Sequence, residues 1–287
     1  MSANGNPEMT ADVQAAEKSK HAYMSTRTKI LFWVTAWAIV LMPFLFWRST
    51  WFGRPLNDKE IGEYLADDSK PRHIQHALVQ VGDRVARGDR SAQQWYPALV
   101  KLARHPVEEI RNTDAWVMGQ DNTQPEFHQA LLTMLNDRSS TVRGNAALQL
   151  VRFNDASGRP QILALLQPIN LQAPRGGTVT DATKPGQTVR EGGLVARIGD
   201  EEVRAPATGR VVSVRAKGTT LQSGAELAVL DPPVEQLWEA LRALYLVGQT
   251  EDLPTVRSYK TYSAENPQRI QQQATETERA ILDRSRK

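Results

Sequence analysis

The residue types that most often carry out chemistry are scarce in this sequence, and their spacing matches no reaction centre. None of the 287 residues is Cys, which excludes disulfides, thiolate catalysis and Cys-ligated zinc. His73 and His76 lie three residues apart, as two metal ligands on one helix would, but no third ligand stands nearby. No His-Glu-x-x-His motif, nucleophile elbow or phosphate-binding Gly loop occurs. We therefore predict no catalytic residue, cofactor or metal site, and a protein that is not an enzyme.

The charges of the chain argue against nucleic acid as a partner. Lys and Arg number 35, and Asp and Glu number 32, so the net charge is only +3. Proteins that bind nucleic acid usually concentrate basic residues on one face, and this sequence shows no such cluster. We expect protein partners instead.

One acidic cluster is a candidate partner contact. Asp200, Glu201 and Glu202 follow Gly199 between two short apolar segments, which is typical of a hairpin turn. Exposed carboxylates steer oppositely charged partners. A short acidic turn is also the ordinary end of a solvated hairpin, and both interpretations stay open here.

An apolar segment near the N-terminus predicts a membrane helix. Residues 1–29 are polar, and we expect a disordered tail. Residues 30–47 carry no charge; these 18 residues would span roughly 27 Å as a helix, against a hydrocarbon core of about 30 Å. Four of the seven Trp lie in or beside this stretch, as Trp does at the headgroup level. A buried globular helix or a cleaved signal peptide fits less well, so we predict one transmembrane helix over residues 30–50.

The charges that flank this segment predict an orientation. Basic residues favour the cytoplasmic side of a membrane. Four precede the segment and three follow it: Lys18, Lys20, Arg27 and Lys29 against Arg48, Arg54 and Lys59. We therefore expect a single-pass protein of a bacterial-type inner (cell) membrane, in contact with the lipid bilayer through residues 30–50 and with its C-terminal part outside the cytoplasm.

A repeat with a period of 32 residues marks the region 55–170. Two segments match at apolar positions spaced as one face of a helix requires, and each is followed by a Pro and a second apolar helix. A degenerate earlier copy is expected over residues 68–104. The matching pairs are Ile110 with Val142, Arg111 with Arg143, Ala115 with Ala147 and Met118 with Leu150.

The second of these segments resembles the consensus of HEAT-type repeats. Asp137 comes first, the Val-Arg pair at residues 142 and 143 comes next, and the pair Ala146 and Ala147 follows. The resemblance implies a solenoid of helix pairs. It also implies that Arg111 and Arg143 are structural, and that the two Ala let helices approach closely.

Residues 171–231 repeat themselves in a different way. Gly and Val are frequent, the helical periodicity is gone, and the second half reproduces the first at an offset of 32 residues. Ala173-Pro174 returns as Ala205-Pro206, and Gly186 and Gly192 return as Gly218 and Gly224. Such a duplication predicts two interlocking four-stranded halves with Gly at tight turns. The pattern resembles the biotinyl/lipoyl domain family, a flattened barrel that periplasmic membrane fusion proteins also contain.

The turn between the two halves departs from that family. Its carrier members present a Lys there as the attachment point of the cofactor. Residues 198–203 contain neither Lys nor Met, while Lys184 and Lys217 fall in other turns, so we expect no covalent biotin or lipoate. Membrane fusion proteins insert a long helical hairpin at this turn, and this sequence has none.

Together these features predict a multidomain α plus β fold. It consists of a single transmembrane helix, an α-solenoid of HEAT-type helix pairs, an inserted biotinyl/lipoyl-like β-barrel, and further HEAT-type helices over residues 232–287. The predicted function is that of a membrane-anchored, non-catalytic scaffold or accessory subunit that binds other proteins of a membrane complex through repeats and barrel. The alternative is a periplasmic adaptor subunit of an export system, similar to a membrane fusion protein.

Overall fold

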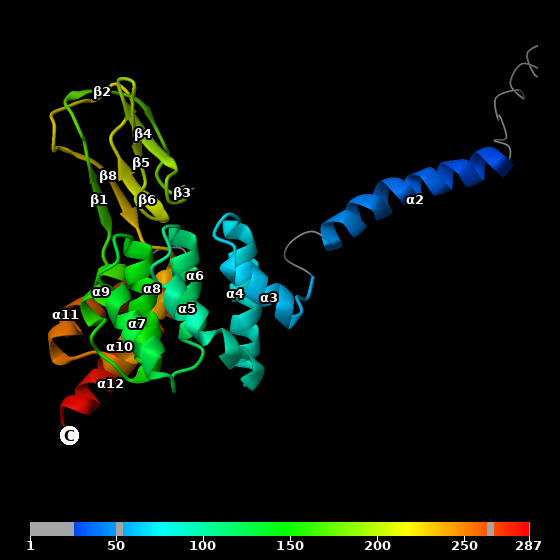
Figure 1. The fold of residues 1–287 in the computed structure, drawn as a ribbon. Helices are drawn as coiled ribbons and strands as arrows, with labels where there is room; N and C mark the ends of the chain where they lie inside the picture. Colours follow the sequence, from blue (N-terminus) through cyan, green and yellow to red (C-terminus); the bar gives the residue numbers. More distant parts are fainter. Residues whose placement is uncertain (1–25, 50–53, 263–266, 287) are drawn as a thin grey trace, which may run out of the picture. The chain divides into compact units, whose positions relative to one another are not determined.

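The computed structural model describes residues 26–49, 54–262 and 267–286. The chain divides into two compact units, Met1–Pro55 and Leu56–Lys287, and each is described by itself. The first unit contributes helix α2, Thr26–Ser49 (Figure 1). The predicted tail lies outside the described residues up to position 25.

The predicted transmembrane helix is wrong. In α2 the uncharged part is confined to residues 30–47, because Arg27 and Lys29 precede it and Arg48 follows it. In the part of the chain that the structure describes, no helix combines the length and apolar character needed to cross a membrane. The single-pass membrane localisation drawn from residues 30–50 is corrected with it; residue 50 itself lies outside the described residues.

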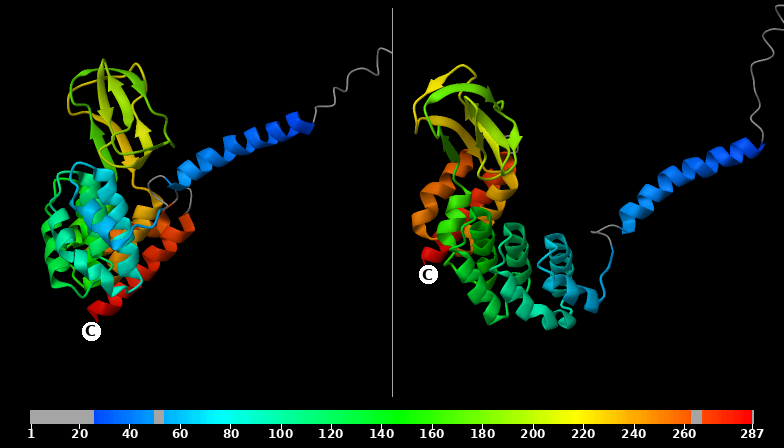
Figure 2. Two further views of the ribbon diagram at one scale, coloured as in Figure 1. Left: turned by 45° about the vertical axis from the view of Figure 1, so that its right-hand side comes forward. Right: turned by 45° about the horizontal axis from the view of Figure 1, so that its top comes forward.

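The second unit is built mainly from short helices that follow one another as pairs (Figures 1 and 2). Helices α4, α6 and α8 pack side by side in one row, while α5, α7 and α9 form the partners of these helices, and α10 packs on α9 and α12. This is a helical repeat fold. The elements are α3 Asp58–Ala66, α4 Pro71–Ala86, η2 Arg90–Trp95, α5 Tyr96–Leu102, α6 Glu108–Met118, α7 Pro125–Met134, α8 Ser140–Leu150, η3 Val151–Phe153, α9 Arg159–Leu165, α10 Val234–Val247, η4 Thr250–Asp252, α11 Leu253–Ser258, η5 Tyr259–Thr261 and α12 Pro267–Ser285.

A recurring turn starts many of these helices. An Asp accepts a hydrogen bond on Oδ1 from the backbone N–H two residues later, as at Asp137, which receives the N–H of Ser139 at 2.8 Å. Such a side chain satisfies a backbone donor that the turn leaves free. The same bond occurs at Asp67, Asp89, Asp121 and Asp155, each with Ser or Thr two residues on. At position 105 the ring of His105 takes this role, with Nδ1 accepting from Val107 N–H at 3.1 Å.

The remaining strands form two four-stranded antiparallel sheets, with the orders β1-β8-β6-β3 and β5-β4-β2-β7. Adding 32 to the residue numbers of one sheet's first-half strands gives the second-half strands of the other, so the sequence duplication exchanges the two sheets. The strands are β1 Ile169–Gln172, β2 Gly177–Ala182, β3 Thr188–Val189, β4 Leu194–Ile198, β5 Glu201–Arg204, β6 Gly209–Val214, β7 Thr220–Leu221 and β8 Glu226–Asp231.

The predicted barrel is wrong, because the two sheets do not close on each other. Strands β1 and β3 end one sheet and β5 and β7 end the other, and each pairs only within its own sheet. Strands β3 and β7 have two residues each, too short to carry a ladder on both sides. The sheets instead share a small apolar core, including Val179, Val195 and Val211, that is separate from the core of the helices.

Candidate functional site

A groove crosses helices α6, α8 and α10, and we call it the array groove. It is a cavity of about 480 Å³, within the range of pockets that hold small ligands or a few side chains. Its lining comes from residues far apart in sequence that the stacked helices bring together: Trp116, Asn145, Leu148, Gln149, Val151, Arg152, Glu239, Arg242, Ala243 and Leu246.

Large apolar side chains gather on the helices around this groove. Among the described residues of the second unit, five such side chains are strongly exposed, and four of them lie on α4, α6 and α10: Val79, Trp116, Tyr245 and Leu246. Trp116 is 36% exposed and Leu246 is 56% exposed, and both line the groove. Exposed apolar clusters on a folded surface typically mark binding sites.

Trp116 is held in place by α4, which packs beside α6. A Cβ atom added at Gly82 of α4 would lie 2.5 Å from the indole Cζ3 of Trp116, so the ring occupies the space that a side chain at position 82 would fill. The indole is therefore fixed against α4 while about a third of its surface stays exposed. A preorganised aromatic side chain of this kind is a typical anchor of protein interfaces.

Amides form the fixed polar part of the groove. The Nδ2 of Asn145 donates to the backbone carbonyl of Asn112 at 2.7 Å, joining α8 to α6, and Gln149 Nε2 donates to Asn145 Oδ1 at 3.1 Å. The bond to Asn112 ties together the two helices that form one wall, and the bond from Gln149 holds the amide of Asn145 in place.

Two cations and one anion line the groove. Arg152, Arg242 and Glu239 are all exposed, and within the described residues none of the three forms an ion pair. The guanidinium of Arg242 lies 4.5 Å from the ring centroid of Trp238, which is a cation–π contact. The groove therefore has one excess positive charge.

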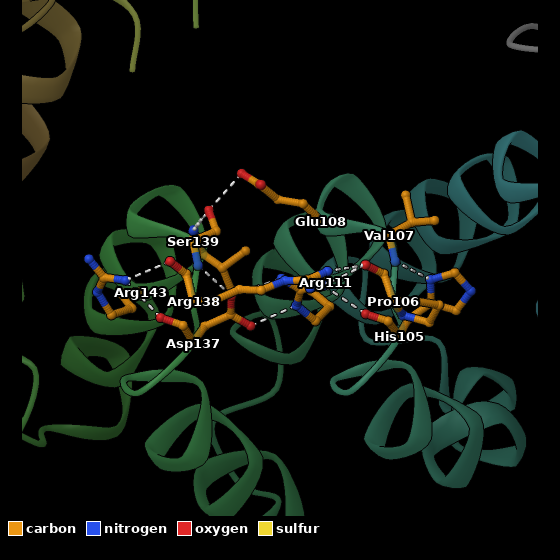
Figure 3. Close-up of polar contacts among 10 residues, drawn as sticks. His105, Pro106, Val107, Glu108, Arg111, Asp137, Arg138, Ser139 and Arg143 are labelled. Atoms are coloured by element: carbon orange, nitrogen blue, oxygen red, sulfur yellow. Dashed lines mark hydrogen bonds and ion pairs between the residues drawn. The ribbon is translucent and has the colours of Figure 1, made fainter. Parts of the chain in front are cut away.

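The predicted structural residue Arg111 forms a clamp between repeats (Figure 3). Its Nε and Nη2 donate to the two carboxylate oxygens of Asp137 at 2.6 and 2.8 Å, and its Nη1 donates to the carbonyls of His105 and Pro106 at 2.7 and 3.1 Å. Arg111 is buried. The hydrogen bonds from its guanidinium hold the pKa of the Asp137 carboxyl below the ordinary value.

Arg143 repeats half of this clamp one repeat later. Its Nη1 donates to the carbonyls of Asp137 and Arg138 at 2.7 and 3.1 Å, the same spacing that Arg111 uses (Figure 3). The position 32 residues after Asp137 is Ile169, the first residue of β1, so the next carboxylate of the series is missing. The ladder of Arg–Asp clamps therefore ends at Arg143.

The predicted small pair Ala146 and Ala147 is fully buried, at the seam that the resemblance implied. An added Cβ at Gly158 would lie 2.7 Å from the Cα and Cβ of Ala147, which shows how closely the chain passes there. The position of Ala146 corresponds to Asp114 in the previous repeat and to Gly82 before that. Neither carboxylate oxygen of Asp114 has a hydrogen-bond partner among the described residues, and burial raises its pKa well above the ordinary value.

The predicted partner contact at the sheet turn is largely neutralised. Gly199, at φ +60°, and Asp200 form the turn between β4 and β5. The carboxylate of Glu201 pairs with Arg175 at 2.8 Å, and that of Glu202 pairs with the arginines at 197 and 204. Within the described residues only Asp200 of the three lacks an ion pair, so the turn is not a strongly acidic surface.

The two histidines considered as metal ligands both contact neighbouring side chains. The ring of His73 stacks on Tyr64 with 4.2 Å between centroids. His76 is buried, and its Nε2 lies 2.7 Å from Nε2 of Gln80, which donates to it.

The sequence prediction did not include the groove residues. A signal was present, since Trp116 and Leu148 are 32 residues apart and both are apolar at a position outside the buried helix face. The contributions of α10 depend on the chain returning to the array after the sheets, which no local pattern specifies.

Comparisons with known proteins assign the chain to no family. No protein-family model matches the sequence, and no curated protein matches it. Among solved structures, it is similar to a designed armadillo repeat protein, YIII(Dq)4CqI, at 15% identity and a TM-score of 0.40, over 77% of this chain and 80% of that chain. This likeness is too distant to bear on function. The helical repeat fold rests on the stacked helices and on the contacts that recur every 32 residues.

Proposed function

We propose that the protein is a non-catalytic scaffold that binds another protein through the array groove. The observation that carries this proposal is a groove lined by two exposed apolar side chains, Trp116 and Leu246, of which Trp116 is fixed against α4. Arrays of helical repeats present extended surfaces of this kind, and protein contact is their usual role.

We assign the repeats to the HEAT type. The assignment is supported by the Arg111–Asp137 clamp, by its half-copy at Arg143, and by the buried pair Ala146 and Ala147. These contacts stiffen the array, and a stiff array loses less conformational entropy when it binds.

The sheets contribute less to this proposal than the helices do. Two of the three carboxylates at their acidic turn are already paired with arginines, and Val212 is the one strongly exposed large apolar side chain among their described residues. The export-adaptor alternative depended on a membrane span and a barrel, and neither is found in the described residues.

The test compares two adjacent positions on α10. Leu246 lines the groove, while Tyr245 is exposed on the same helix but does not line it. In the affinity-tagged full chain, we expect Leu246→Glu to reduce co-purification of the bound protein at least about tenfold, because interface anchors commonly contribute more than about 1.4 kcal/mol. Tyr245→Glu introduces the same charge and should leave co-purification unchanged.

Circular dichroism of both variants serves as the folding control. Equal retention of the partner by the two folded variants would contradict the proposal. It would show that a charge introduced in the groove does not affect binding, so the groove would not be the binding surface.

A further inference from the structure

We infer that the segment bound in the array groove is acidic, with carboxylates beside a single large apolar anchor. This inference rests on the proposed function and specifies the chemistry of the partner. It is drawn from the charges of the groove and from the way in which two of its arginines are held.

The apolar part of the groove accommodates the anchor. Trp116, Leu148 and Leu246 contribute apolar surface from three different helices, and the cavity of about 480 Å³ is large enough for one aromatic or long aliphatic side chain and its neighbours. Trp116 is fixed over Gly82, so the anchor meets a preformed surface.

The charged part of the groove favours carboxylates. Arg152 and Arg242 are both exposed, and Glu239 is the single acidic residue of the lining. Some arginines elsewhere in the helical part are already paired, for example Arg111 with Asp137 and Arg257 with Glu278. Neither groove arginine forms an ion pair with a carboxylate within the described residues.

One contact restrains each arginine, at the side chain of Arg242 and at the backbone of Arg152. A cation–π contact with Trp238 restrains the guanidinium of Arg242, and no carboxylate of the described residues forms an ion pair with it. The backbone of Arg152 is fixed at its carbonyl, which accepts from Asn122 Nδ2 at 2.7 Å. A guanidinium binds a carboxylate through two parallel hydrogen bonds, which gives such a pair geometric specificity.

The experiment uses a library of random twelve-residue peptides displayed on phage. The full-length protein and its Arg152→Glu/Arg242→Glu variant are used as separate targets. We expect the wild type to select peptides with one aromatic or large aliphatic residue and a net negative charge. The variant should prefer basic peptides, because the sign of the groove is reversed.

A second charge-reversed variant serves as the matched control. Arg87→Glu/Arg104→Glu changes the net charge by the same amount at exposed array positions outside the groove. It should select the same acidic peptides as the wild type. A synthetic peptide from the selection should bind the groove variant at least about tenfold more weakly than the wild type, and bind the control variant equally well.

The outcomes separate the two proposals. Selected peptides that carry no net charge, or that bind the groove variant as well as the wild type, would overturn the inference while leaving the groove as a binding surface. Failure of every folded target to enrich any peptide would count against the proposed function itself.

Discussion

The helical array and the pair of sheets are both built on a sequence repeat of 32 residues, yet they use it in opposite ways. In the array the repeat is a translation, since Arg111 clamps Asp137 of the next repeat and Arg143 begins the same contact again. In the sheets the repeat is an exchange, since the strand order of one sheet becomes that of the other when the halves are swapped.

This difference explains where binding surface is available. In a translational repeat, the last copy has no following copy to supply its contact partner. Such an array therefore keeps an incomplete clamp at its end and a continuous exposed face along its length. In the sheets, each half of the repeat supplies the strands that the other half pairs with, so neither half lacks a partner. The inward-facing residues of the two sheets bury one another. The exposed apolar side chains of the second unit follow this division, with four on the helices and Val212 alone on the sheets among the described residues.

The largest expected effect comes from filling the seam between repeats. Ala147→Arg places a long charged side chain where the chain at Gly158 passes in direct contact. Overpacking and the burial of a charge together should lower the free energy of unfolding by at least about 3 kcal/mol. Urea denaturation of the full chain, followed by circular dichroism, measures the change; Ala146→Arg should behave alike. A midpoint no lower than that of Arg143→Ala would show that the seam is not closely packed.

The complete and the unfinished clamp provide a matched pair of variants. Arg111→Ala leaves the partly buried carboxylate of Asp137 without its cation, which should cost about 3 kcal/mol, the low end for a buried ion pair. Arg143→Ala removes bonds to two carbonyls from a partly exposed site and should cost about 1 kcal/mol. The same urea experiment compares them. Equal losses would mean that the ladder of clamps does not end at Arg143.

A substitution at Asp114 should stabilise the array. Asp114→Ala installs the residue that the next repeat has at this position and removes a buried carboxyl without a partner, a gain of about 1–3 kcal/mol at pH 7. Burial raises the pKa of Asp114 in the folded state. The folded wild type is therefore most stable, with respect to this group, below the ordinary carboxyl pKa, where the carboxyl is protonated in both states. That stability is lost as the pH rises toward the raised pKa, because the unfolded chain ionises more easily.

The advantage of Asp114→Ala should therefore shrink as the pH falls toward about 4. Thermal unfolding of both proteins from pH 4 to pH 8 measures it. A gain that does not vary with pH would exclude the buried carboxyl as its cause.

The smallest effect is expected from removing the sheets. Their first and last strands pair with Ile169 opposite Leu230, so the chain leaves the helices and returns to them at neighbouring points, and the two cores are separate. Replacing residues 169–230 by a short Gly-Ser linker should change the free energy of unfolding of the helices by less than about 1 kcal/mol. A cooperative loss of all helical signal in this variant would show that the sheets are part of the array's core.

The sequence allowed the helical repeat to be predicted because burial fixes the apolar period, as at Ile110 and Val142. The closure of the sheets could not be read in the same way, since it depends on the length of β3 and β7, and two-residue strands leave no periodic signal. The burial of Asp114 was equally hidden, because a buried Asp and a solvated Asp look alike in a sequence. The helix-starting turns were visible as Asp-x-Ser or Asp-x-Thr but were not used.

The most direct test of the division between array and sheets is site-specific photo-crosslinking in the native cell. A benzophenone amino acid is placed in the full chain at Leu246, which is 56% exposed in the array groove, or at Val212, which is 45% exposed on the sheets. Irradiation should give a discrete protein adduct from position 246 and none from position 212. Adducts from position 212 alone, or from neither position, would contradict the assignment of binding to the array.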